Sequence, residues 1–189
     1  MAGSGVRVRT ADPARDAEPV AEIYRYYVDD TDISFEEVAP SVDEMRGRME
    51  AVLAWTPWLV AEDVESDRVV GYAYASRHRE RAGYRWSVDI SVYVDRSWHR
   101  RGVGRALYAA LVPILRRQGM VNVYAGIAVP NPGSVALHES LGMKQIGLYE
   151  QVGFKFGTWP DVAWFALRLN EPTAEPAEPT PFPELRPAE

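Results

Sequence analysis

The chain has 189 residues, of which 47% are hydrophobic and 25% charged, and its formal net charge is −6 at pH 7. Its length and composition predict one globular domain with a sizeable core, and the negative charge disfavours general nucleic-acid binding. The chain has no cysteine, which excludes disulfides and cysteine-bound metals, and its three histidines are scattered without the spacing of a zinc site. No apolar run approaches about 18 residues, so we expect a cytoplasmic protein without a metal, a membrane partner or a nucleic-acid partner.

The N-terminal part predicts a short strand followed by two helices. Residues 6–9 alternate as a strand does, and Asp12-Pro13 is typical of a helix start. Residues 41–44 form a capping box for a second helix, which ends before Pro57. Phe35 lies between the helices, and we expect it either in the core or against a pocket.

The middle of the chain predicts three strands. Residues 58–61 and 69–75 form a hairpin around a polar turn, and residues 86–94 are rich in β-branched and aromatic side chains. The basic segment 77–85 precedes this third, central strand. On residue type alone it is either a solvated loop or part of a binding site.

The C-terminal part alternates between helices and strands. An apolar pattern predicts a helix from about residue 103 to residue 118, a strand over 121–129 and a short helix over 135–141. Two further strands are expected at 145–154 and 162–169. Residues 171–189 are rich in Pro, Glu and Ala, so we predict a domain over 1–170 and a disordered tail over 171–189.

Residues 91–108 run from a strand through a glycine loop into a helix. Gly102 and Gly104 permit close approach of a ligand, and the start of the following helix favours an anion. The loop lacks both Gly-Lys-Ser/Thr and the third glycine of a dinucleotide fold, where Leu107 stands. Three arginines in and after the loop add positive charge, so the segment predicts a pyrophosphate site.

The run Arg-Arg-Gly-Val-Gly-Arg, residues 100–105, resembles the acetyl-CoA signature of the GNAT acyltransferases, which is usually Gln/Arg-x-x-Gly-x-Gly/Ala. His99 at the first position departs from that pattern. The resemblance implies an α/β (α+β) GNAT fold. That fold has a mixed, mostly antiparallel sheet of six to seven strands, splayed at the central strand and flanked by about four helices.

Three further blocks resemble one branch, the phosphinothricin and methionine sulfone/sulfoximine N-acetyltransferases. They are residues 84–94, 131–142 and 152–162, the last containing Gly-Phe-Lys-Phe-Gly-Thr-Trp-Pro-Asp. The resemblance implies an acyl-CoA-dependent N-acetyltransferase that uses acetyl-CoA and a small-molecule amine acceptor. The acetyl group would pass to an α-amino group by direct attack in a ternary complex, in a protein expected to form a homodimer.

The resemblance also assigns roles to single residues. The family's general base is Glu where this chain has Asp89, which is shorter by one methylene and would act through a water. His138 is the competing base, and Tyr108 is the expected acid for the leaving thiolate. The implied cofactor-binding residues are Val92, Tyr93, Val94, Arg100, Arg101, Gly102, Val103, Gly104, Arg105, Asn131 and Ser134. The implied substrate-binding residues are Phe35, Arg79, Arg81 and Tyr84.

Purely structural roles remain open for the same residues. Asp89 suits the exposed face of a strand, His138 and Tyr108 suit a packed interior, and Asn131 suits a turn before proline. Another amine, such as an arylamine, a polyamine or a protein N-terminus, is an alternative acceptor. Asp89 and His99 also leave open a CoA-binding module without catalysis.

Overall fold

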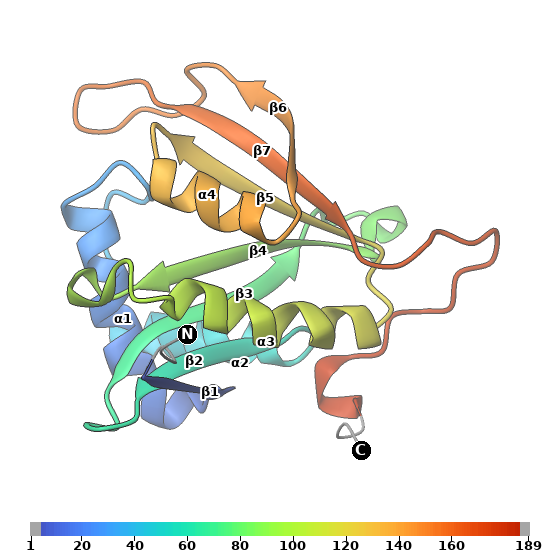
Figure 1. The fold of residues 1–189 in the computed structure, drawn as a ribbon, viewed down its shortest axis with the longest axis horizontal. Helices are drawn as coiled ribbons and strands as arrows, with labels where there is room; N and C mark the ends of the chain where they lie inside the picture. The colour runs from blue at the N-terminus through green and yellow to red at the C-terminus, as the bar shows by residue number, and fades with distance from the viewer. Residues whose placement is uncertain (1–4, 186–189) are drawn as a thin grey trace.

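The computed structural model describes residues 5–185, which form one open sheet with two helices on each face (Figure 1). The sheet confirms the predicted α/β fold class, with seven strands and four helices among the described residues. The strands are β1 (Val6–Thr10), β2 (Trp58–Asp63), β3 (Val69–Arg77), β4 (Ser87–Val94), β5 (Asn122–Val129), β6 (Lys144–Tyr149) and β7 (Asp161–Arg168). The helices are α1 (Pro13–Asp29), α2 (Val42–Leu53), α3 (Val103–Arg117) and α4 (Pro132–Ser140).

The sheet divides in its middle. Its strand order is β1-β2-β3-β4-β5-β7-β6, and β4 and β5 form the parallel pair among otherwise antiparallel neighbours. They pair only from Ser87 opposite Asn122 to Asp89 opposite Tyr124. Beyond Asp89 the two strands separate, which confirms the predicted splay and leaves a gap between them.

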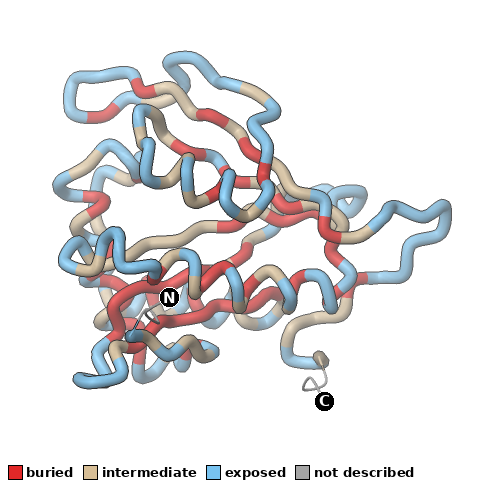
Figure 2. Tube along the Cα trace, in the orientation of Figure 1, coloured by how far each residue is buried: buried red, intermediate tan, exposed pale blue. Residues whose placement is uncertain are grey.

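Side chains of β4 alternate between the two helical layers. Val88 and Ile90 are buried with α3, whereas Tyr93 lies in the layer of α1 and contacts Tyr27. Because successive side chains of a strand point to opposite faces, Asp89 shares the face of α1 and α2. Figure 1 shows α3 and α4 in front of the sheet, and Figure 2 shows that β2, β3 and α3 carry much of the buried core.

Both predicted helix starts are confirmed. Asp12 accepts a hydrogen bond from the Ala14 N–H, and Ser41 and Glu44 exchange both bonds of a capping box. The capping-box helix, α2, ends at Leu53, as expected before Pro57. Local sequence therefore fixes where the layer of α1 and α2 begins.

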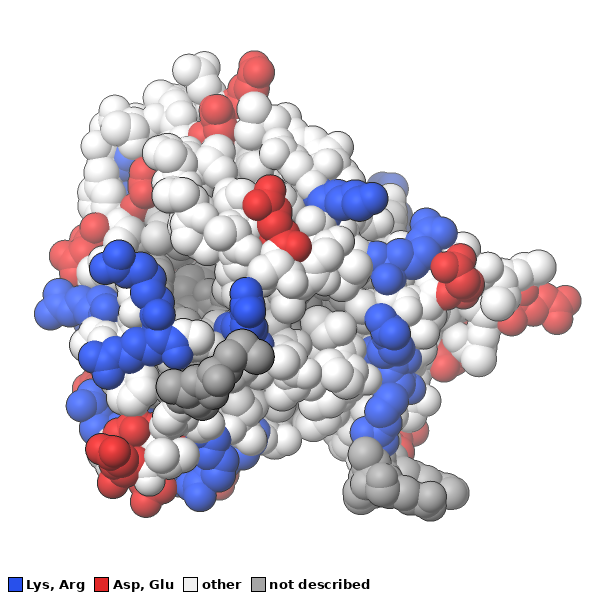
Figure 3. All heavy atoms as spheres, in the orientation of Figure 1, with Lys and Arg blue, Asp and Glu red and all other residues white. Residues whose placement is uncertain are grey.

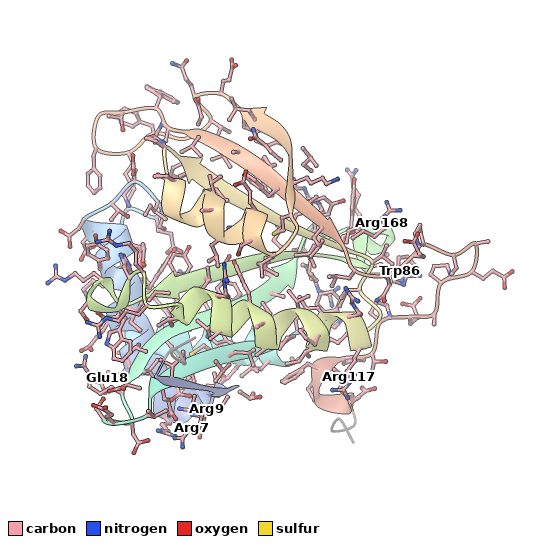
Figure 4. All side chains as sticks on the ribbon, viewed as in Figure 1. Arg7, Arg9, Glu18, Trp86, Arg117 and Arg168 are labelled. Carbon is pink, nitrogen blue, oxygen red and sulfur yellow. The ribbon has the colours of Figure 1, made fainter. Side chains whose placement is uncertain are left out.

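A buried carboxylate ties the edge strand β1 to the rest of the fold. Glu62 of β2 is 0% exposed and forms ion pairs with Arg7, Arg9 and Arg15 at 2.6–2.7 Å. Hydrogen bonds from Arg9 and Arg7 outweigh the burial of Glu62 and lower its pKa to about 2. Figure 4 shows Arg7 and Arg9 under β1.

The C-terminal segment differs from the disorder expected over 171–189. Residues 171–185 run from β7 to the end of α3, and residues 186–189 lie outside the described part. The Trp86 indole donates to the Ala177 carbonyl at 2.8 Å, Gln118 donates to Thr180 at 2.9 Å, and Arg85 pairs with Glu178 at 2.7 Å. Pro179 is also buried, so polar contacts and local packing hold a Pro-rich segment whose composition alone indicates no structure; Figure 4 shows Trp86 beside it.

Strand β6 is shorter than the sequence predicts. The strand expected over 145–154 ends at Tyr149, because the chain turns there and Gln151 adopts a left-handed φ of 49°.

Within residues 5–185, no helix has the length and apolar character needed to cross a membrane.

Candidate active site

The glycine loop ends in an open helix N-terminus. Gly102 caps α3 in the left-handed conformation with φ 82°, and Arg100 is also left-handed with φ 61°. The first backbone bond of α3 runs from the Ala106 N–H to the Gly102 carbonyl, so the amides of Val103, Gly104 and Arg105 have no partner within the helix.

These amides and the loop arginines are suited to a pyrophosphate. Three consecutive N–H groups and the positive end of the helix dipole favour an anion. Arg100, Arg101 and Arg105 are exposed around the loop. Figure 3 shows Lys and Arg side chains gathered where Figure 1 places this loop.

Gly104 is constrained by helix packing as well. A Cβ atom at this position would lie 2.9 Å from Cδ2 of Leu137 on α4. An added Cβ would therefore require the Leu137 side chain to move, so the second glycine of the motif also contributes to the packing of α3 against α4.

His99 turns away from the loop amides and supports the end of β4. Its Nε2 lies 3.0 Å from the Val94 carbonyl and 3.0 Å from the Tyr27 hydroxyl. The Tyr27 hydroxyl donates to the Val94 carbonyl at 2.6 Å and accepts from the Val94 N–H at 3.2 Å. Both backbone groups of Val94 are thus engaged, whereas Val92 and Tyr93 line the open part of β4.

Asp89 lies at the closed end of the gap and is paired with a histidine. Nδ1 of His78, the residue after β3, is 2.6 Å from Oδ1 of Asp89. The side chains are 15% and 24% exposed, respectively. The His78 ring stacks on Tyr124 of β5 with ring centroids 4.5 Å apart, and Tyr84 lies 5.9 Å away at its edge.

The environment of Asp89 favours the neutral acid more than water does. Burial raises the pKa of Asp89, while the hydrogen bond and charge of His78 and the charge of Arg79 oppose that rise. The Arg79 guanidinium also donates to the His78 carbonyl at 2.7 Å. The site therefore contains a partly desolvated carboxylate with two basic neighbours.

Tyr108 and His138 form a second pair on the other face of the sheet. The Tyr108 hydroxyl is 3.2 Å from His138 Nε2, and these side chains are 0% and 3% exposed. His138 Nδ1 is 2.8 Å from the Ser134 carbonyl, which can only accept, so Nδ1 carries the proton and Nε2 accepts from Tyr108. Burial raises the pKa of Tyr108 and lowers that of His138, which favours the neutral form of each.

The two pairs lie on opposite sides of the β4–β5 gap. Tyr108 packs in the core under α3, and the ring of His138 lies 6.3 Å from Phe165, a buried residue of that core. The Asp89–His78 pair faces the layer of α1 and α2 instead. The gap is thus flanked by the partly exposed Asp89–His78 pair on one face of the sheet and by the buried Tyr108–His138 pair on the other.

Asn131 and Ser134 organise the start of α4. The Asn131 side-chain oxygen accepts from the Ser134 N–H at 3.1 Å and caps the helix. The predicted turn role of Asn131 is therefore present. Ser134 contributes its carbonyl to His138, so it positions the histidine.

A lysine closes the side of the site formed by two loops. Lys155 in the β6–β7 loop is 5% exposed, and its Nζ donates to the carbonyls of Val28 and Ser34, each at 2.6 Å. Phe35, beside Ser34, packs directly on Gly153, where an added Cβ would clash with the ring. Phe35 is 38% exposed, so it is part of this loop contact and also faces solvent.

The expected site residues therefore fall into groups. The structure brings Asp89, Arg79 and Tyr84 together around His78, whereas Arg81 is exposed at the start of the short turn over 82–84. Sequence reasoning missed His78 and Lys155 as site residues. The available signal for His78 was its place in the basic segment before the central strand, and for Lys155 its place in the block at 152–162.

Comparisons with known proteins agree with this geometry. A family model described as "Acetyltransferase (GNAT) domain" matches residues 9–164. Phosphinothricin N-acetyltransferase of Streptomyces coelicolor is 36% identical over 166 residues, covering 82% of this chain and 91% of that protein. L-methionine sulfoximine/L-methionine sulfone acetyltransferase of Salmonella typhimurium is 36% identical over 171 residues, covering 90% and 98%.

A solved structure shows the same arrangement of elements. The GNAT superfamily phosphinothricin acetyltransferase from Sinorhizobium meliloti, in complex with acetyl-CoA, superposes with a TM-score of 0.85. It is 37% identical in sequence, and the match covers 93% of this chain and 94% of that one.

Proposed function

Because the chain belongs to the acetyltransferase (GNAT) family, we propose that it transfers acetyl from acetyl-CoA to the α-amino group of a small amino-acid-like acceptor. The acceptor class is that of phosphinothricin and methionine sulfone or sulfoximine. The observation that carries the proposal is the separation of β4 from β5 beyond Asp89, with a helix N-terminus and arginines following β4.

In this proposal the pyrophosphate of acetyl-CoA binds the amides of residues 102–105 together with Arg100 and Arg101. The pantetheine arm pairs with the free edge of β4 at Val92, whose backbone groups face the gap, as an added strand would. The open first turn of α3 and the absence of a β5 ladder along that part of β4 support this placement. Asn131, which caps α4, is the further proposed contact of the pantetheine arm.

The chemistry requires a proton acceptor on one side of the thioester. An ammonium has no lone pair, so the acceptor amine must lose a proton before its nitrogen attacks the thioester carbon. A C–N bond then forms, the C–S bond breaks with its electron pair moving to sulfur, and Tyr108 is the proposed proton donor to the thiolate. The geometry supports a base at Asp89 rather than His138, because Nε2 of His138 already accepts a hydrogen bond from the Tyr108 hydroxyl.

Charge and shape favour an anionic acceptor. Arg79 and Arg81 can bind a carboxylate, and they would repel a polyamine. Tyr84 and Phe35 supply aromatic surface on either side, from the segment before β4 and the loop after α1.

The oligomeric state and location also belong to this proposal. We propose a homodimer in the cytoplasm, where acetyl-CoA is available. Exposed apolar side chains on β6 and the loop after it, including Ile146, Leu148, Val152 and Phe154, support self-association. Light scattering after size-exclusion chromatography would report a dimer or a monomer directly.

Thiol release from acetyl-CoA tests the proposed reaction. L-methionine sulfone and phosphinothricin should stimulate release strongly, whereas spermidine and an arylamine should not. Intact acetyl-CoA binding without stimulation by any amine would indicate a binding module without catalysis. A preference for spermidine would overturn the assigned acceptor class.

A further inference from the structure

His78 is a partly buried histidine beside the gap that the proposed chemistry has not used. Because a carboxylate can only accept a hydrogen bond, the 2.6 Å contact with ionised Asp89 places the imidazole proton on Nδ1. Nε2 of the neutral ring then carries a lone pair. Among residues 5–185, no side chain or backbone group forms a hydrogen bond with this Nε2.

Aromatic rings fix the orientation of His78. Tyr124 stacks on one side of the imidazole, and Trp164 of β7 lies edge-on with ring centroids 6.3 Å apart. The Trp164 Nε1 atom is buried without a hydrogen-bond partner in the described structure. The residue that packs on His78 therefore has an N–H group that a bound ligand could use.

We propose that His78 is the catalytic base that takes the proton from the acceptor's ammonium group, and that Asp89 is its positioning residue. This inference rests on the proposed acetyl transfer and specifies how that reaction begins. Asp89 holds the ring through Nδ1–H and stabilises the imidazolium that forms, as the carboxylate does in a Ser-His-Asp triad.

The geometry favours His78 over direct action of Asp89. One oxygen of the short Asp89 side chain is already bound to His78, and the imidazole carries the basic atom further out from the strand. Imidazole is also the side chain whose protonation changes near neutral pH, which suits proton transfer at physiological pH. The raised pKa of Asp89 agrees with a carboxylate that is partly desolvated beneath the imidazole.

Protons and electrons balance in this scheme. Nε2 of His78 takes one proton from the ammonium, and the freed nitrogen lone pair forms the C–N bond as the C–S bond breaks. The second amine proton leaves as the amide forms, and the thiolate gains one proton to give CoA thiol. His78 then releases its proton to solvent, so the net reaction yields the acetylated amine, CoA and one proton.

Charged and titratable groups from several elements surround the pair of His78 and Asp89. Asp89 faces it from β4, Arg79 adjoins it along the chain, and Tyr84 lies at its edge from the turn before β4. Tyr124 faces it from β5, and Tyr74 of β3 lies on the same face of the sheet and interacts with Asp89. Asp89 is the group in direct hydrogen-bond contact with the imidazole.

The test compares wild type with His78→Asn, whose side-chain amide can keep the bond to Asp89 but cannot take a proton. We expect kcat/KM for methionine sulfone to fall about 100-fold at pH 7 while the acetyl-CoA Kd stays unchanged. The deficit should shrink as the pH approaches 9, because the free amine then loses its proton in solution. Added imidazole should restore part of the activity of His78→Ala, but none of the activity of His78→Ala/Asp89→Asn.

Each outcome separates the two proposals. An active wild type with an equally active His78→Asn overturns the dyad and leaves acetyl transfer intact. A His78→Asn variant with lower kcat/KM but an unchanged pH profile and no imidazole rescue of His78→Ala also overturns it, since the histidine is then structural. A wild type that acetylates no amine overturns the proposed function and the dyad with it.

Discussion

Replacing Lys155 by Met tests whether one buried ammonium group joins the loop after α1 to the β6–β7 loop. The two hydrogen bonds from Nζ to the carbonyls of Val28 and Ser34 are each 2.6 Å long. Hydrogen bonds from a charged group contribute about 1.5–3 kcal/mol each. Burial lowers the pKa of Lys155, which shows that desolvation of the ammonium offsets part of that gain.

We therefore expect Lys155→Met to lower the free energy of unfolding by about 2–3 kcal/mol, which corresponds to a fall in Tm of about 5–10 °C for a domain of this size. Lys144→Met is the matched control, because Lys144 is exposed and should change stability by less than about 0.5 kcal/mol. Since the bond to Ser34 also fixes Phe35, the acceptor KM should rise while the acetyl-CoA KM stays constant. Equal Tm values for the two variants, measured by circular dichroism, would refute this reasoning.

Three further predictions concern the gap and the core. Tyr108→Phe should lower kcat by about 100-fold if the hydroxyl protonates the thiolate, and an unchanged kcat would exclude Tyr108 as the acid. The same change should lower the free energy of unfolding by about 1–3 kcal/mol, because His138 Nε2 loses its hydrogen-bond donor. Gly47→Ala in α2, where the added Cβ meets open space, should stabilise the fold by about 0.5–1 kcal/mol. Gly104→Ala should be less favourable than Gly47→Ala, because its Cβ requires the Leu137 side chain to move; urea denaturation compares the two. The pKa of Glu62 is about 2 in the folded state against an ordinary 4.5, so the unfolded state binds more protons below pH 5. The free energy of unfolding should therefore fall from about pH 5 to pH 2, and Glu62→Gln should weaken this pH dependence. A free energy of unfolding that stays constant over this range in urea titrations would contradict the argument.

Local signals predicted the parts of the fold that depend on nearby residues. The capping box at Ser41 and the cap at Asp12 lie within one turn of the helices they start, and the glycine loop adjoins both its strand and its helix. The splay between β4 and β5 came from the family resemblance, because neither strand alone indicates where its pairing ends.

The parts that sequence reasoning missed depend on contacts between distant segments. His78 meets Asp89 because the β3–β4 register sets Ser76 opposite Asp89, and no local pattern fixes that register. Lys155 binds backbone carbonyls, which every residue possesses and no sequence pattern marks. The tail is ordered by the side chains of Trp86 and Gln118, far away along the chain, although its own composition favours disorder.

The gap between β4 and β5 places a solvent-accessible seam in the centre of the sheet. Beyond Asp89 and Tyr124, amides that point into the seam have no strand partner across it, so they should exchange with deuterium at rates usually seen at sheet edges. A bound pantetheine arm would act as an eighth strand and slow exchange over residues 91–93 and 125–128, with β1 and β2 unaffected. The substrate would then complete the sheet, and each catalytic cycle would open and close its centre once.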